Sequence, residues 1–315
     1  MVAALFLGMK RRKKRFRWAL YESLRLVERE EAFRLLKWAV DSLPPPWDCG
    51  WKGVGRKPYD ARALTVVTVW QEIEGKPERA YTADLERDRE HLRLLGLEHA
   101  PHRTALYRTR KKLSEDYIRQ LNQKILERLK PAKKVGADAT GLRQSRRNCA
   151  WSSTSESGRR EYVKLHALFN LETRTVETLE ATPGTEHECG HLEGLLTNID
   201  DIESLVADAG YLSRKNCKLI AEKGGTPYIK PKKNSLMKAM GCWPWKSMVI
   251  LFREHPRVFN RFYKLRQRVE AGWHSLKSMV GDVVRNRTAQ TINAEIWSKI
   301  TCYNLIWTIR GSHGF

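Results

Sequence analysis

The order of strand-like and helix-like segments after Pro131 limits the fold most strongly. Strand patterns, with alternating apolar residues or runs of β-branched residues, come first, at 133–142, 161–172 and 174–182. The short polar link between the second and third strands predicts an antiparallel hairpin. Then follow a helix over 186–199, a short apolar strand at 204–211, a helix after Ser213, a strand at 226–233, and helices over about 256–280 and 289–310. This order predicts an α/β domain with a mixed five-stranded sheet flanked by helices.

The residues before Pro131 show only helical spacing. Apolar residues recur at helical intervals between Leu20 and Val40, and the prolines at 44–46 end that helix. Further helices are predicted to begin at Asp60, Thr82, Pro101 and Ser114, with Gly96 as a left-handed C-cap. The predicted organisation is an all-helical N-terminal domain over residues 1–130, followed by the α/β domain over residues 131–315.

The charge balance points to an anionic partner. Lys and Arg number 58 and Asp and Glu 36, which gives a formal net charge of +22. A polyanion is the simplest partner for such an excess. A membrane surface is the competing partner, but no stretch approaches the ~18 continuous apolar residues of a spanning helix. The six cysteines form no C-x2-C pair, so we expect reduced thiols and a cytoplasmic protein.

Basic residues cluster in two places in the N-terminal third. Lys10 to Arg17 reads KRRKKRFR, which is either a solvated arm or an arm that follows DNA phosphates. The segment 82–112 is expected to form a helix, a glycine turn and a basic helix. It is either a helix-turn-helix with Arg103, Tyr107, Arg108 and Arg110 facing DNA, or a plain helical bundle that carries charge.

The stretch from Tyr263 to Lys277 has an unusual polar stripe. At ~100° per residue, one continuous helix would place Tyr263, Arg266, Glu270 and Lys277 within an arc of about 60°, beside an apolar face. The simplest interpretation is a solvated amphipathic helix in which Arg266 and Glu270 form an ordinary ion pair. The alternative is a functional stripe, provided that acidic residues elsewhere complete a site.

These residues resemble a known family. The pattern Y-x2-R-x3-E-x6-K, the contexts ADATG at Asp138 and ADAGY at Asp208, and GLEHAPHRTALYRTRKKLSEDY over 96–117 resemble the DDE transposases of bacterial and archaeal insertion sequences, of the IS4/IS5 type. The resemblance covers roughly residues 55–310. The strand and helix order is similar to that of the ribonuclease-H-like fold, in which the first and fourth strands are parallel neighbours.

The resemblance implies an active site. Asp138, Asp208 and Glu270 would converge at the carboxyl edge of the sheet as catalytic residues and ligands of two Mg²⁺ or Mn²⁺ ions, since oxygen-only ligands select hard cations. Tyr263, Arg266 and Lys277 would hold the phosphates of a DNA end. Lys230, Lys232 and Lys233 are either further phosphate contacts or solvated side chains.

Three functions remain open at this point. The first is a transposase that cuts and rejoins double-stranded DNA at terminal inverted repeats, as a homodimer by family analogy and in association with the nucleoid. The others are a related nuclease or resolvase without strand transfer, and a non-catalytic DNA-binding protein. The interval between Asp208 and Glu270 is too short for the β-domain that some relatives insert there to hold a hairpin or flipped base. Trp243 or Trp245 could wedge an unstacked base instead, or be an ordinary core residue.

Overall fold

The computed structural model describes residues 18–51, 53–55, 57–145 and 162–314. The basic run Lys10–Arg17 and most of the residues between the strands predicted at 133–142 and 161–172 lie outside these residues. Within the described part of the chain, no helix combines the length and the apolar character needed to cross a bilayer.

The N-terminal region is helical, as its sequence predicts. Asp60 caps α2 by accepting a hydrogen bond from the Ala63 amide at 2.9 Å, and Ser114 caps α6 in the same way. Thr82, predicted as an N-cap, instead lies inside α3, and Asp88 separates α3 from α4 by capping the latter. The helices are α1 (Trp18–Asp41), α2 (Ala61–Glu74), α3 (Glu78–Arg87), α4 (Arg89–Leu95), α5 (Arg103–Lys112) and α6 (Glu115–Leu126).

The sheet has the predicted mixed topology. Its order is β3-β2-β1-β4-β5, with β1–β2 and β2–β3 antiparallel and β1–β4 and β4–β5 parallel. A two-residue strand, β6, pairs with the far end of β1. With the helical region before it, this arrangement is consistent with a ribonuclease-H-like fold. The strands are β1 (Lys134–Gln144), β2 (Tyr162–Asn170), β3 (Val176–Pro183), β4 (Ser204–Ala207), β5 (Thr226–Ile229) and β6 (Val283–Val284).

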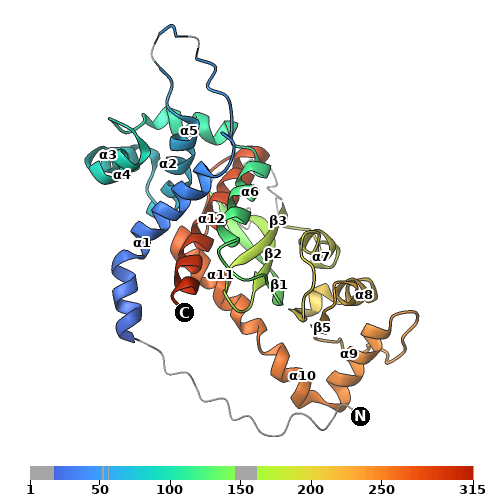
Figure 1. Ribbon diagram of the computed structural model, residues 1–315. Coiled ribbons are helices and arrows are strands. Elements are labelled where there is room, and N and C mark those ends of the chain that lie inside the picture. Colours follow the sequence, from blue (N-terminus) through green and yellow to red (C-terminus); the bar gives the residue numbers. More distant parts are fainter. Residues whose placement is uncertain (1–17, 52, 56, 146–161, 315) are drawn as a thin grey trace.

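Helices cover both faces of the sheet (Figure 1). α11 lies close against β1, and Gly136 makes this possible. A Cβ at this position would stand only 2.4 Å from the Val269 side chain. α7 packs on β2 and β3, and α8 packs on β5. The remaining helices are the 3-10 turns η1 (Glu188–Gly190) and η2 (Ala209–Tyr211), and α7 (Leu192–Leu195), α8 (Arg214–Glu222), α9 (Trp243–Glu254), α10 (Pro256–Tyr263), α11 (Arg266–Val280) and α12 (Ala289–Ser312).

Helix α12 joins the N-terminal helices to the sheet. It is buried along nearly its whole length and packs against α1, α2, α5 and α6 as well as α11 and β3. The amide of Asn304 on α12 donates to Asn122 on α6 and to the Val176 carbonyl on β3, both at 2.8 Å. Since these groups are buried, the bonds fix the three elements relative to one another.

Three predicted elements differ in the structure. The helix expected over 186–199 is reduced to η1 and the four-residue α7, in a segment whose Gly190 and Gly194 disfavour a long helix. The helix α9 was not predicted, although Pro244 stands in its first turn. The single helix expected over 256–280 is two helices, α10 and α11, separated by a turn at Lys264 and Leu265.

Candidate active site

The two candidate aspartates lie side by side at one edge of the sheet. Ala137 on β1 and Ala207 on β4 form the last parallel pair of these strands. Asp138 and Asp208 follow them directly, so both carboxylates stand where β4 ends. Ligands of open α/β sheets collect outside this edge. Asp208 accepts a hydrogen bond from the Ala209 amide at 2.7 Å through one oxygen, which leaves lone pairs for another partner.

The environment of Asp138 disfavours its charged form. Burial is the largest cause and raises the pKa of this carboxyl to about 6, from an ordinary value of 3.8. The Ala139 amide and the Arg266 guanidinium oppose this rise, while the negative charges of Glu188 and Asp208 add to it. Asp138 therefore lies among several charged groups from distant parts of the chain, as a ligand of a cation would.

The turn between α10 and α11 brings Tyr263 and Arg266 together. Successive i→i+3 hydrogen bonds replace the α-helical pattern here, such as Leu265 N to Phe262 O at 2.9 Å. The Tyr263 ring stacks on Phe259 in the core. Burial raises the pKa of Tyr263, and the nearby Arg266 partly offsets that rise. The tight turn, rather than one regular helix, places these two side chains.

Arg266 is the common neighbour of the three candidate carboxylates. Its Nη2 atom binds Glu270 Oε1 at 2.5 Å. Although burial works against its charge, the surrounding Tyr263, Glu270 and both aspartates raise the pKa of Arg266 above its ordinary value. In the described residues, no three Asp, Glu, His or Cys side chains converge as ready ligands for a metal ion. The carboxylates are thus arranged around a guanidinium.

Several lysines border the same edge. Lys277 Nζ donates to Thr140 Oγ1 on β1 at 2.7 Å, and burial lowers the pKa of this lysine. Lys230 follows Ile229, which pairs with Ala207, and therefore lies at the level of Asp208. Lys230, Lys232 and Lys233 are exposed. Lys230 is thus exposed at the level of the aspartates, whereas Lys277 is half-buried and already bonded to Thr140.

The four residues on α5 that were predicted to face DNA divide into two groups. Arg103, Tyr107 and Arg108 are exposed, as contact with DNA requires. The prediction that Arg110 faces DNA is wrong. Its side chain is buried and binds Glu78 at 2.6 Å and Glu72 at 3.2 Å. A buried arginine with two carboxylate partners holds helices together.

The two tryptophans after β5 have different environments. Trp245 is buried, donates to the Leu236 carbonyl at 2.9 Å, and carries Arg214 over its ring. It is therefore the core residue that one of the two interpretations expected. Trp243 is 67% exposed, with Lys246 over its face.

The sequence interpretation did not single out Glu188, which lies near the aspartates. It follows His187 in the segment HECGH, and its carboxylate binds Lys164 Nζ at 3.2 Å. A Cβ on Gly210, two residues after Asp208, would stand 2.3 Å from Glu188 Oε2. The missing side chain at Gly210 therefore makes room for this fourth carboxylate. The only sequence signal for the position of Glu188 was a glutamate in the segment before β4 and a glycine in the segment after it.

Comparison with known proteins identifies the family. A family profile described as "Transposase DDE domain" matches residues 130–305, which is more than half of the chain. The chain belongs to the transposase DDE domain family. This membership implies a phosphoryl-transfer enzyme that binds DNA and carries out cleavage and joining of the transposase type. A comparison with curated proteins gave no match.

The residues at the sheet edge of this transposase fit the divalent metal ion that its family typically uses. Every candidate ligand is a carboxylate, and oxygen ligands favour Mg²⁺ or Mn²⁺ over softer metals. Burial and neighbouring negative charge both raise the pKa of Asp138. A bound cation would relieve both effects by favouring the ionised carboxylate.

Proposed function

We propose that this protein is an insertion-sequence transposase of the IS4/IS5 type, which cuts and rejoins DNA strands at terminal inverted repeats. The adjacency of Asp138 and Asp208, with Arg266 and Glu270 beside them, supports the proposal most strongly. In it, the two aspartates and Glu270 are the catalytic residues and hold two Mg²⁺ or Mn²⁺ ions. Such ions, when bound, activate a water or 3′-hydroxyl nucleophile and stabilise the leaving oxygen.

Arg266 has a central role in this proposal. Its planar fork suits bidentate binding of a DNA phosphate, but in the DNA-free protein Glu270 binds the fork. A phosphate that takes the place of Glu270 would release this carboxylate to join Asp138 and Asp208. DNA should therefore raise the affinity of the protein for Mn²⁺, because the two ligands favour the same arrangement. A Mn²⁺ affinity that the DNA end leaves unchanged would contradict this exchange.

The remaining basic residues would hold the duplex. In this proposal the phosphates near the cut would be contacted by Tyr263, Lys277, Lys230, Lys232 and Lys233. Arg103 and Arg108 would contact the duplex further away. We propose that residues 1–130 form the DNA-binding domain and residues 131–315 the catalytic domain. We further propose that two copies pair in the complex that brings two DNA ends together, at the nucleoid in the cytoplasm.

The catalytic proposal is tested with Asp208→Asn. This change keeps the size of the side chain and removes its charge, so Mg²⁺-dependent cleavage of the DNA that flanks the gene should be lost while DNA binding remains. Glu222→Gln, an exposed carboxylate on α8, serves as the control. Unchanged cleavage by the Asp208 variant would exclude this site. Cleavage by the wild type without joined products would indicate a nuclease instead.

A further inference from the structure

A cavity of about 790 Å³ lies between the N-terminal helices and the start of α12. Its walls come from α2, α5 and the segment that connects β6 to α12, and we call it the α2–α5–α12 cavity. Five cationic side chains and three carboxylates line it. Whether it attracts anions depends on which of these charges are already paired.

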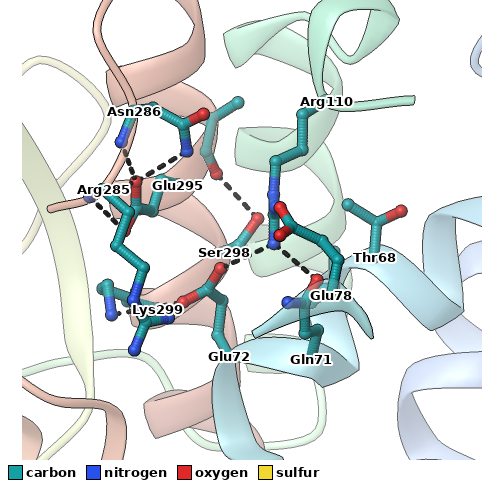
Figure 2. Close-up of polar contacts among 12 residues, drawn as sticks. Thr68, Gln71, Glu72, Glu78, Arg110, Arg285, Asn286, Glu295, Ser298 and Lys299 are labelled. Atoms are coloured by element: carbon teal, nitrogen blue, oxygen red, sulfur yellow. Dashed lines mark hydrogen bonds and ion pairs between the residues drawn. The ribbon is translucent and has the colours of Figure 1, made fainter. Parts of the chain in front are cut away.

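The floor of the cavity is a network of paired charges, shown in Figure 2. Arg110 binds Glu72 and Glu78, and Glu72 also binds the buried Lys299 at 3.2 Å. Glu295 accepts hydrogen bonds from the backbone amides of Arg285 and Asn286. Every carboxylate of the lining therefore has a cationic or N–H partner, and none of them is free.

The rim of the cavity is cationic. Arg103 and Lys111 come from α5, and Arg285 and Arg287 come from the segment before α12. All four are exposed, and within the described residues none forms an ion pair with a carboxylate. Tyr107, half exposed between them, carries Lys111 over its ring at 4.7 Å. Three arginines and one lysine without carboxylate partners, around a polar cavity, suit the oxygens of a phosphate chain.

The length of β1 gives the distance from this cavity to the sheet edge that carries Asp138. Ser145 lines the cavity and donates its amide hydrogen to Val284 on β6 at 2.9 Å. Ser145 directly follows β1, and Asp138 lies seven residues before it along the chain, which corresponds to about 23 Å at ~3.3 Å per residue. A duplex that runs parallel to β1 would span this distance in about seven base pairs, because B-DNA rises ~3.4 Å per base pair.

We propose that the α2–α5–α12 cavity binds backbone phosphates of the DNA duplex about seven base pairs from the scissile phosphate. The rim combines residues of the N-terminal third with residues near the C-terminus, and together they form one phosphate site. The position of these phosphates relative to the cut rests on the proposed catalytic role of Asp138. The binding of a duplex to the rim is independent of that role.

Salt-dependent binding of a short duplex, measured by fluorescence anisotropy without divalent cations, tests the rim. Arg103→Ala, Lys111→Ala and Arg287→Ala should each lower the slope of log affinity against log salt by ~0.9, and the triple variant by about three times as much. Lys218→Ala, an exposed lysine on α8, is the matched control. Thermal unfolding checks that each variant is folded. A triple variant with the wild-type slope would overturn the proposal.

A second measurement tests the position with the DNA end that flanks the gene. A neutral methylphosphonate about seven base pairs from the cut should weaken binding to the wild type and leave binding to the triple variant nearly unchanged, since the contact is already lost. An equal loss for both proteins would refute the assigned position. Because neither measurement requires cleavage, loss of the catalytic proposal in the Asp208→Asn assay would leave the rim result standing.

Discussion

Lowering the pH from 7 to 5 should weaken Mn²⁺ binding to the DNA-free transposase about tenfold. Asp138 must be ionised to bind a cation, and its pKa is about 6. At pH 7 about nine in ten Asp138 side chains are ionised, and at pH 5 only about one in eleven. Affinity is thus lost as the pH falls through 6. A carboxyl with the ordinary value of 3.8 would stay ionised at pH 5, so its affinity would change little.

Two substitutions connect this loss to its causes. Glu188→Gln removes one negative charge that raises the pKa of Asp138, so the ratio of Mn²⁺ affinities at pH 7 and pH 5 should fall. Gly210→Ala should act in the same direction, because its new Cβ would displace the Glu188 carboxylate. The control is Glu193→Gln, whose exposed carboxylate pairs with Lys215. Isothermal titration at the two pH values measures each ratio.

The ratio is more informative than either affinity, because a general weakening of the site cancels in it. Equal Mn²⁺ affinity at pH 7 and pH 5 in the wild type would refute the account of Asp138 as a partly buried ligand for which protons and Mn²⁺ compete. If both the Glu188 and Gly210 variants kept the wild-type ratio of Mn²⁺ affinities, the acid dependence would still hold. Glu188 would then be excluded as one of its causes.

Two further predictions concern DNA binding and stability. Arg266→Ala should lower the salt slope of DNA binding by about one, measured by anisotropy, because one phosphate contact is lost; an unaltered slope would exclude Arg266 as that contact. His166 is buried, and burial, followed by the nearby charges of His191 and Lys164, lowers its pKa to about 3. As the pH falls below 6.5, His166 becomes protonated in the unfolded chain but stays neutral in the folded protein. This residue should therefore lower the free energy of unfolding of the wild type by about 2 kcal/mol between pH 7 and pH 5. Urea unfolding of His166→Gln should show a correspondingly smaller fall, and an equal fall would refute the assignment.

Local signals in the sequence predicted much of the fold. Asp60, Ser114 and Ser213 each cap the helix that follows, and Gly96 has the left-handed backbone of a C-cap, with φ of 65°. Such features depend on a few neighbouring residues, and sequence reasoning detects them directly. The parallel pairing of β1 with β4 came from the resemblance to a known fold, since no local signal identifies a distant partner strand.

The errors arose where distant residues decide the outcome. The turn at Lys264 and Leu265 carries no glycine or proline, and helical spacing continues through it. Arg110 lies in a basic stretch, but partners on α2 and α3 hold it inside the protein. Glu188 comes near Asp138 and Asp208 because Gly210 lacks a side chain. For Arg110 and Glu188 the deciding contact joins segments that are far apart in the sequence.

The buried charges between α2, α5 and α12 bear on how DNA recognition is coupled to cleavage. Lys299 on α12 is almost fully buried, and it binds Glu72 on α2 and the Val280 carbonyl at the end of α11. Separating these elements would leave buried charges without partners, at a cost of about 3–5 kcal/mol for a single broken pair. α5 is held to the same network through Arg110. Buried contacts therefore connect the walls of the α2–α5–α12 cavity to the helix that carries Glu270. If the rim binds phosphates and Glu270 acts at the cut, as proposed, these contacts would set the distance between the two.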